Sequence, residues 1–361
     1  MIKTLLNLAH VDEGTKHCTD TIRLVFADLA VTVHGNEPML LAALADYYRS
    51  YTSIEAQATV ALDLYVIEQE AAGEELDWLA VPREEGKQGR KEGYIDVAGG
   101  RWIKKFKTGM AFLQRPQKLL AIGPCAANLA QIINFINNQF LNLYLRHDFT
   151  LGHASAFSVN GAVTAIAAGS GGGKSTLMLR CLENPARHFL TNDRILLKKT
   201  EQGTKAMGLA KLPRVNPGTL LHSDRLRHIL PESRQQALAQ MTQAELWSIE
   251  EKYDVQIEDD YGAGRVDLAG NLERLIMLDW SLSSDEPTQI EAVDLSSEPD
   301  AIEGLRKRPG PFFQGKDGAF IDLNAIRSVS HYASELSQVA VYRLKGKIDF
   351  DYAYELIAAL D

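Results

Sequence analysis

One glycine-rich segment of the sequence carries residue types suited to binding phosphate groups. It reads AIAAGSGGGKSTLML over residues 165–179. Because small residues let a backbone wrap closely around an anion, consecutive N–H groups can point inward, and a following helix adds its positive end. Lys174 can then reach the outer phosphates of a nucleotide, and the Ser175 hydroxyl can bind Mg²⁺. The expected nucleotide-binding residues are Gly169, Ser170, Gly171, Gly172, Gly173, Lys174, Ser175 and Thr176.

The loop departs at one position from the usual phosphate-loop pattern, G-x-x-x-x-G-K-[ST]. Ala168 occupies the place of the first glycine, and Gly169, one residue later, can supply the backbone freedom. The alternative is a glycine-rich turn between a strand and a helix that binds no ligand. The run of three glycines before Lys174, placed between a strand pattern and a helix pattern, favours the nucleotide site.

Charged residues after the next strand pattern are candidates for the chemistry itself. Asp193 in TNDRILL stands at a strand end, where phosphoryl-transfer sites place a metal-binding carboxylate; an Asn-Asp pair that only forms a turn is the alternative. Arg194 can neutralise phosphate, orient Asp193 or simply be exposed. Arg214 lies between prolines in PRVNPG, where an arginine fork suits phosphate unless its role is structural. Lys211 is a weaker candidate of the same kind.

Several of these features together resemble the HPr kinase/phosphorylase family. They are His153, the Asn160-Gly161 hairpin, the glycine-rich loop and the TNDR segment. The resemblance is closer to the HPr-kinase-related kinase B branch, which has an asparagine before the aspartate at this place. Further segments that look like that branch are KEGYIDVAGGRWIKKFKTGM (91–110), GPCAANLAQIINFINNQ (123–139) and KLPRVNPGTLL (211–221). The resemblance implies an α/β fold with a mixed α+β sheet, a P-loop kinase core of the HPr kinase and phosphoenolpyruvate-carboxykinase type, and ATP and Mg²⁺ as ligands.

Carried to this chain, the resemblance gives each matched residue a role. Lys174 and Ser175 bind phosphate and metal, and His153 lies near the triphosphate. The family's first motif aspartate, the base for the acceptor hydroxyl, is Asn192 here. Because an amide cannot take a proton at neutral pH, Asp193 must serve as base, as metal ligand or as both, and the departure argues against the reverse phosphorylase reaction. The predicted catalytic residues are Asp193, Lys174, His153 and Arg214, and the predicted metal ligands are Ser175 and Asp193.

Strand and helix patterns around the loop are those that a phosphate site needs. ASAFSV and VTAIAA predict two strands joined by the turn Asn160-Gly161, a helix follows the loop, and strand patterns come next, giving the order strand, loop, helix, strand. The later strands are HFLTND (188–193) and RILLKK (194–199), a helical composition is found at QAELWSIEEKYD (243–254), and loops are predicted at PRVNPG (213–218) and KRPGPF (307–312).

The residues before the loop mix strand and helix patterns and carry no motif of known chemistry. The sequence predicts strands over 21–26, 29–34 and 58–68, a helix over 39–51, a loop over 69–93, a hairpin turn at Gly99-Gly100 and a long helix over 126–146. We therefore predict two domains: an N-terminal α+β region of unknown role over residues 1–147, and a P-loop kinase-like catalytic domain over residues 148–361.

Composition and charge exclude some classes of protein. The chain of 361 residues has a net charge of −9, and residues 245–303 hold seventeen acidic and three basic residues, so we expect no nucleic-acid partner. Apolar runs fall far short of the ~18 residues of a membrane span, and the N-terminal apolar stretch is too short for a signal peptide. Three scattered cysteines without CxxC spacing fit reduced thiols. We expect a cytoplasmic protein without a membrane partner, and by the resemblance a possible homo-oligomer.

The sequence leaves more than one function open. The leading hypothesis is an ATP-dependent kinase whose acceptor is, by the resemblance, a serine of a protein; a small-molecule hydroxyl is a variant of it. The second hypothesis is a nucleotide-binding regulator with little or no turnover, suggested by Asn192 and Ala168. A decarboxylating carboxykinase is disfavoured, because the expected set of metal-binding histidine, lysine and aspartate is not visible.

Overall fold

The computed structural model describes residues 8–52, 58–71, 76–83, 89–116, 118–169, 171–249 and 251–360. Internal contacts divide the chain into two compact units. Unit 1 comprises Met1–Asp148 and Arg308–Ile326, and unit 2 comprises Phe149–Lys307 and Arg327–Asp361. The sequence placed 308–326 in the second domain, whereas its contacts are with unit 1. Each unit is built on a mixed sheet with helices, which gives the chain a mixed α/β architecture.

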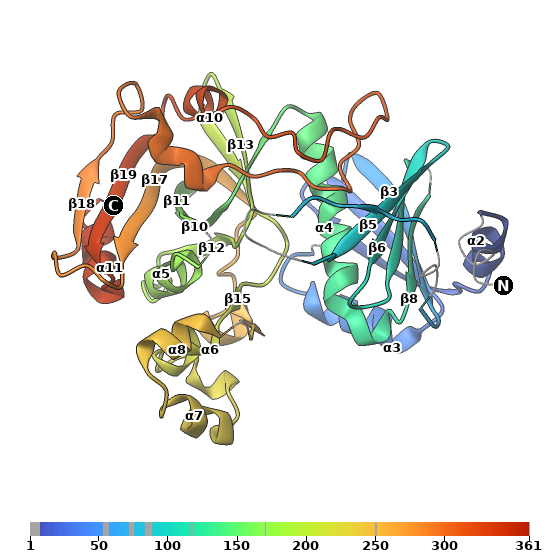
Figure 1. The fold of residues 1–361 in the computed structure, drawn as a ribbon, viewed down its shortest axis with the longest axis horizontal. Coiled ribbons are helices and arrows are strands. Elements are labelled where there is room, and N and C mark those ends of the chain that lie inside the picture. Colours follow the sequence, from blue (N-terminus) through green and yellow to red (C-terminus); the bar gives the residue numbers. More distant parts are fainter. Residues whose placement is uncertain are drawn as a thin grey trace. The chain divides into compact units, whose positions relative to one another are not determined.

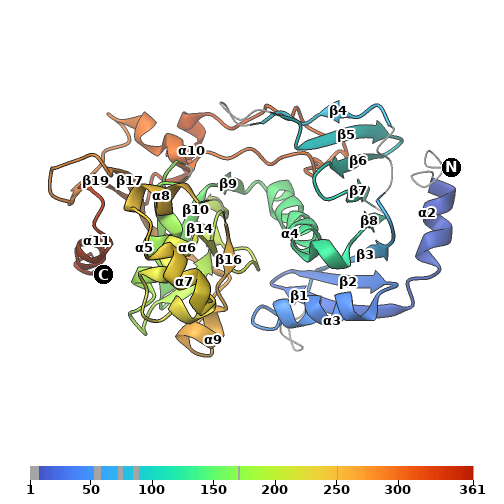
Figure 2. The ribbon, with the colours of Figure 1, turned by 60° about the horizontal axis from the view of Figure 1, so that its bottom comes forward.

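Unit 1 is built on a sheet with the strand order β1-β2-β3-β8-β7-β6-β5-β4. Strands β2, β3 and β8 run parallel and the other neighbours run antiparallel. Helix α3 lies along β1 and β2 (Figure 2). The elements are α2 (Leu8–Thr15), β1 (Asp20–Phe26), β2 (Leu29–Gly35), α3 (Pro38–Tyr47), β3 (Val60–Glu68), β4 (Leu79–Ala80), β5 (Glu92–Val97), β6 (Gly100–Lys105), β7 (Ala111–Gln114), β8 (Leu119–Gly123), η1 (Ala126–Asn128) and α4 (Leu129–Arg146).

The segment 308–326 completes the core of unit 1. Phe312 is buried, and its ring centroid lies 5.7 Å from that of Phe112 and 5.4 Å from that of Phe135. The side chain of Asn142, in α4, donates a hydrogen bond to the Phe312 carbonyl at 2.9 Å. Arg146 Nε, also in α4, donates to the carbonyl of Gln314. Unit 1 therefore needs a piece of chain that follows most of unit 2 in sequence.

Unit 2 is organised around the long strand β17, whose two edges carry different partners. Strand β11 pairs in parallel with one edge of β17. On the other edge, β14 pairs antiparallel with the first part of β17 and β19 pairs in parallel with the rest. The full strand order is β12-β10-β11-β17-β14-β13-β9, with β19 on β17 and β18 on β19. Helices α5 and α11 lie beside each other next to this sheet (Figure 1). This arrangement places the loop between β11 and α5 at the end of a central strand.

The remaining bounds show how the unit is assembled. Its elements are β9 (Thr150–Gly152), β10 (Ala154–Val159), β11 (Ala162–Ala167), α5 (Lys174–Cys181), β12 (His188–Thr191), β13 (Ile195–Thr200), β14 (Gly203–Met207), β15 (Arg214–Val215), α6 (Pro217–Leu221), η2 (Arg227–Ile229), α7 (Glu232–Leu238), α8 (Gln243–Ser248), β16 (Tyr253–Asp254), α9 (Ile257–Tyr261), β17 (Ala269–Ser281), β18 (Gln289–Ala292), η3 (Pro299–Leu305), α10 (Val329–Glu335), β19 (Ala340–Lys347) and α11 (Phe350–Ala358).

Local sequence signals account for much of this order. Asn160 and Gly161 have positive φ and join β10 to β11 in a two-residue turn, as predicted. The other hairpin is displaced by one residue, because Val97 pairs with Gly100 and the turn is Ala98-Gly99. The helix predicted over 243–254 ends at Ser248. The last two residues of the predicted range instead form strand β16, which pairs with β15. The predicted loop 69–93 contains β4 and the start of β5.

Two further observations concern the chain as a whole. Cys18, Cys125 and Cys181 are buried free thiols, and burial raises the pKa of Cys18 to about 11. In the described part of the chain, none of the helices combines the length and the apolar character that a bilayer crossing requires.

The role of Phe312 in the core of unit 1 can be tested by Phe312→Ala. Truncating a buried aromatic ring leaves a cavity, so we expect the free energy of unfolding of unit 1 to fall by about 3–5 kcal/mol. Denaturant titration with hydrogen exchange of unit 1 peptides measures it. Lys316→Ala is the control: Lys316 pairs with Asp148 where both side chains are exposed, so its loss is worth at most about 1 kcal/mol. Equal losses in both variants would contradict the assignment.

Candidate functional site

The loop after β11 contains glycines in the left-handed backbone conformation. Gly171 and Gly173 have φ of 79° and 89°, in the left-handed region that favours glycine, and α5 begins directly afterwards. Ala168 is not one of these left-handed positions, so alanine is accommodated where the usual pattern has glycine. Ser170, a predicted nucleotide-binding residue, lies outside the described residues. The loop and the N-terminus of α5 therefore present backbone N–H groups at the end of β11.

Lys174 is folded back over the start of this loop. Its Nζ atom donates hydrogen bonds to the carbonyls of Ala168 (3.1 Å) and Gly169 (3.0 Å), and the residue is 7% exposed. Burial lowers the pKa of Lys174 to about 8, and the positive charges of Lys307 and Lys252 act in the same direction. The ammonium group is thus held by neutral acceptors in a cation-rich region, where an anion would be a stronger partner.

Asn192 links the start of α5 to strand β10. Its side-chain oxygen accepts hydrogen bonds from Ser175 Oγ and from Ser155 Oγ, both at 2.7 Å, and Asn192 is buried. The predicted metal ligands were Ser175 and Asp193, but the group within hydrogen-bond distance of Ser175 Oγ is the Asn192 amide. The metal role of Asp193 stays a prediction. Amide and hydroxyl oxygens are both ligands that Mg²⁺ accepts.

Asp193 stands in a strained turn among cations. Its φ is 73°, unusual for a residue with a side chain, and its carboxylate lies 3.3 Å from His153 Nε2, 3.7 Å from Arg194 Nε and 4.0 Å from Lys307 Nζ. Burial alone would raise the pKa of Asp193, but the hydrogen bond from His153 and the charges of Arg194, Lys307 and Lys211 outweigh it and hold the pKa well below its usual range. These interactions therefore favour the ionised form of Asp193.

His153 orients this carboxylate from the start of β10. Burial lowers the pKa of His153, and the charges of Lys174 and Lys307 lower it further, against the opposing effect of Asp193. A neutral ring that donates its Nε2–H to Asp193 fits both observations. The backbone N–H of His153 donates to the Leu305 carbonyl at 2.7 Å, which fixes the residue to η3. The structure thus brings together His153, Asp193 and Lys174, three of the four residues predicted to be catalytic, and their roles stay predictions.

Arg214, the other predicted phosphate contact, is partly engaged within the protein. Its Nε lies 3.0 Å from Asp254 Oδ1, and its NH2 group donates to the Lys252 carbonyl at 3.4 Å. It nevertheless lines the same cavity as the phosphate loop. Thr176, also predicted, forms a 2.7 Å hydrogen bond with the Thr219 hydroxyl and so joins α5 to α6.

Residues from the C-terminal part of the chain support the loop and were not identified from the sequence. Trp280 Nε1, at the end of β17, donates to the Gly172 carbonyl at 3.0 Å, and the rings of Trp280 and Phe350 meet edge to face at 5.2 Å. A Cβ on Gly173 would lie 3.1 Å from Phe350, and one on Gly304 would lie 3.0 Å from the Ala168 backbone. The contacts that these residues make with the loop span more than a hundred residues, and no local pattern reveals them.

A cavity of about 1060 Å³ lies beside the loop. Its lining includes Gly173, Thr176, Arg180, Arg214, Thr219 and Phe350. Within it, the side-chain oxygen of Asn216 is buried without a hydrogen-bond partner. The volume is sufficient for a nucleotide.

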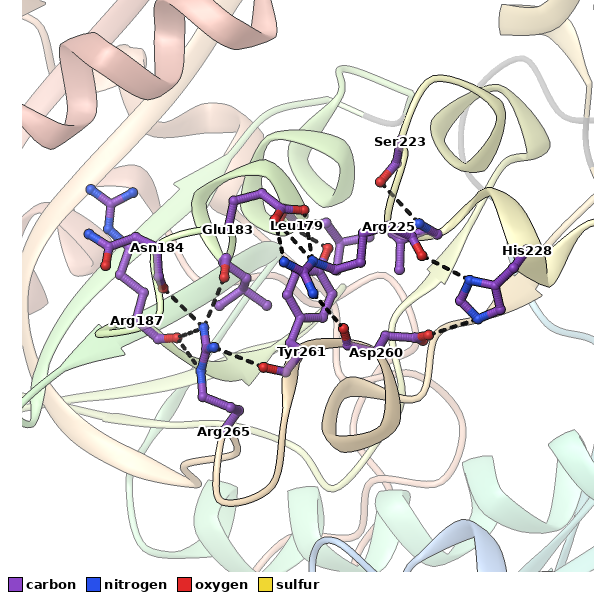
Figure 3. Close-up of polar contacts among 12 residues, drawn as sticks. Leu179, Glu183, Asn184, Arg187, Ser223, Arg225, His228, Asp260, Tyr261 and Arg265 are labelled. Atoms are coloured by element: carbon purple, nitrogen blue, oxygen red, sulfur yellow. Dashed lines mark hydrogen bonds and ion pairs between the residues drawn. The ribbon is translucent and has the colours of Figure 1, made fainter.

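Some residues that line the cavity, Glu183, Arg225 and Tyr261 among them, belong to a polar network drawn in Figure 3. Arg225 Nε donates to Glu183 Oε2 at 2.9 Å, and another of its nitrogens donates to the Asp260 carbonyl at 2.9 Å. Asp260 in turn lies 3.1 Å from His228 Nε2, and the Tyr261 hydroxyl donates to the Leu179 carbonyl of α5. The network fixes the residues after α5 to the segment around η2 and α9.

The comparisons with known proteins give likenesses to solved structures but no match at the level of sequence. No protein-family model matches the chain, and no curated protein matches it. Among solved structures, the Hpr(Ser) kinase/phosphatase from Coxiella burnetii aligns with 58% of this chain and 89% of its own length, at 12% identity and a TM-score of 0.28. At this similarity we infer no function from the alignment, and the HPr kinase-type core stays a prediction.

The support that Trp280 gives to the loop can be measured with Trp280→Phe. The variant keeps the ring but removes the N–H, so the Gly172 carbonyl loses its partner at a cost of about 1 kcal/mol, or roughly fivefold in the affinity of the loop for an anion. Calorimetry with magnesium pyrophosphate checks this, with Trp102→Phe in unit 1 as the control. Unchanged binding in Trp280→Phe would show that the hydrogen bond does not position the loop.

Proposed function

We propose that this chain is an ATP-dependent phosphotransferase that binds magnesium ATP at residues 169–176 and transfers its γ-phosphate to a hydroxyl group. The observation that carries the proposal is the glycine loop at the N-terminus of α5, with Lys174 folded over it and the ionised Asp193 close by. Loop, ammonium and carboxylate supply phosphate binding, charge neutralisation and orientation of an acceptor, which are the main requirements of phosphoryl transfer.

The residues around the loop suit a nucleotide in its magnesium form. Phosphate oxygens would replace the Ala168 and Gly169 carbonyls as acceptors for Lys174, which regains a full anionic partner. The oxygens of Ser175 and Asn192 lie together at the start of α5 and are suitable ligands for Mg²⁺. Magnesium, when bound, neutralises charge on the transferred phosphate.

Asp193 would orient the acceptor hydroxyl. Its low pKa makes it a weak base, but a loose phosphoryl-transfer transition state requires little proton removal before the phosphate departs. His153 Nε2, 3.3 Å from the Asp193 carboxylate, would hold that carboxylate in place. By the resemblance to HPr kinases, the acceptor hydroxyl is a serine of a protein; a small-molecule hydroxyl is the variant.

A second candidate function is a nucleotide-binding regulator. It is favoured by the Asn192 amide beside Ser175, where the related kinases are expected to have a carboxylate, and by the weak basicity of Asp193. Such a protein would bind magnesium ATP through the same loop but would transfer no phosphate.

A transfer assay separates the two functions. With γ-labelled ATP, Mg²⁺ and a lysate of the source cells, we expect the wild type to label one protein or metabolite. Lys174→Ala should lose both labelling and ATP binding. Asp193→Asn should transfer phosphate at least 100-fold more slowly while it retains most ATP binding. Label is followed by gel and by chromatography.

The outcomes are distinct. Labelling by Asp193→Asn at the wild-type rate would remove Asp193 from the mechanism. ATP binding that depends on Lys174 without any labelling would establish the regulator. No magnesium ATP binding by the wild type would refute both functions.

The pKa of Lys174 predicts a pH dependence of nucleotide binding. The pKa of Lys174 is about 8 in the free protein, and a bound anion favours the charged form of the lysine. The affinity for magnesium ATP should therefore fall above about pH 8. The fall should approach tenfold per pH unit until the pH reaches the higher pKa that Lys174 has in the complex. In Lys174→Arg the guanidinium stays charged, so the decline should disappear. Lys211, whose pKa is also lowered to about 8, serves as the control, and Lys211→Gln should keep the decline. Calorimetry from pH 6.5 to 9.5 provides the test.

A further inference from the structure

Three cations around Asp193 do not belong to the lining of the nucleotide cavity. They are Arg194, Lys211 and Lys307, and each lowers the pKa of Asp193 through its charge. The cavity has its own cations near the loop, Lys174 among them. The group around Asp193 is therefore a separate concentration of positive charge, which we call the Asp193 cluster.

The Asp193 cluster has more positive charge than its carboxylate can balance. Arg194, Lys211 and Lys307 surround the single Asp193 carboxylate, and another nearby acid, Asp254, is paired with Arg214. Burial and the charges of Arg194 and Arg214 lower the pKa of Lys211 to about 8, as expected where cations repel one another. An additional anion would relieve this repulsion.

The contacts within the cluster are long and leave a donor unused. Arg194 Nε is buried without a hydrogen-bond partner, and it lies 3.7 Å from the Asp193 carboxylate. Lys307 Nζ lies 4.0 Å from the same carboxylate, which is beyond direct hydrogen bonding. The Asp193 side chain is 43% exposed, so a ligand can approach it from solvent.

Hydrogen bonds fix the backbone at two of these residues, Lys307 and Arg194. The Lys307 N–H donates to the Tyr332 hydroxyl at 3.1 Å, and that hydroxyl donates to the Leu151 carbonyl. The Arg194 carbonyl accepts from Thr191 Oγ1 at 2.6 Å, which closes the turn that carries Asp193. Cations on a fixed backbone suit the binding of one compact anion.

We propose that Arg194, Lys211 and Lys307 bind one anionic group, a phosphate or a carboxylate, carried by the molecule whose hydroxyl meets Asp193. The acceptor would then be an anionic hydroxyl compound or an acidic stretch around a hydroxyl residue. The assignment to an acceptor rests on the proposed function, whereas the anion site itself does not. The site would place the acceptor by its charge, with the hydroxyl at Asp193.

Inorganic phosphate is the probe for this site, used with Lys174→Ala so that the phosphate loop is disabled. We expect one phosphate to bind this variant in calorimetry. Adding Lys307→Gln to this variant should weaken its affinity for phosphate at least tenfold, whereas adding Lys307→Arg should largely preserve that affinity. Adding Arg194→Gln instead should weaken phosphate binding by a similar factor. The matched control is Lys252→Gln, because Lys252 also acts on Lys174 through its charge but is not part of the Asp193 cluster. Acetate run in competition shows whether a carboxylate occupies the site as well.

The result separates this proposal from the proposed function. No phosphate binding to Lys174→Ala, or binding that Lys307→Gln and Arg194→Gln both leave unchanged, would overturn the anion site. Phosphate binding with the expected losses, in a protein whose wild type does not bind magnesium ATP, would support the anion site and overturn only the kinase. In an active kinase, Lys307→Gln should raise the KM for the acceptor by at least tenfold and leave the Kd for magnesium ATP within threefold.

Discussion

The close contact between η3 and the start of the glycine loop after β11 is the constraint on which the candidate site depends. It is possible because Gly304 has no side chain: a Cβ there would lie 3.0 Å from the Ala168 backbone. From this contact the chain continues to Leu305, whose carbonyl holds His153, and to Lys307, which faces Asp193. One small residue therefore allows the loop, the histidine and a cation of the Asp193 cluster to share an anchor, with Trp280 securing the loop at Gly172.

Electrostatics give the site its character. Burial, together with neighbouring positive charges, lowers the pKa of Lys174 and Lys211, while a hydrogen bond and nearby cations hold the pKa of Asp193 low. Such a region is costly without anions, because buried like charges repel. Binding of a polyphosphate at the loop would satisfy Lys174, and binding of a second anion would satisfy the cluster around Asp193. The same charges that favour anions lower the pKa of Asp193, so in the proposed reaction this carboxylate would orient the acceptor more than it would take up its proton.

Local signals in the sequence predicted the local structure well. The glycine loop, the turn at Asn160-Gly161 and the strand before Asp193 follow from short-range rules of turns and periodicity. Tertiary pairing overrode those rules at 243–254, where β16 interrupts a helical composition. The long-range partners of the loop could not be predicted, because Trp280, Lys307 and Phe350 reach it only through the order of strands in the sheet. The proximity of Asn192 to Ser175 likewise depends on how β12 lies against β10.

The interleaving of the two units has a consequence for the order in which the protein can fold as it is synthesised. Domains generally fold from the N-terminus as the chain emerges. Here the core of unit 1 lacks Phe312 until residues 149–307 have been made, so the first 148 residues leave the ribosome with Phe112 and Phe135 uncovered. A protein made in this way would depend on a chaperone during synthesis, or on rapid folding of unit 2, to keep that apolar surface from aggregating. For the same reason, one proteolytic cut after Asp148 would not yield two complete folding units.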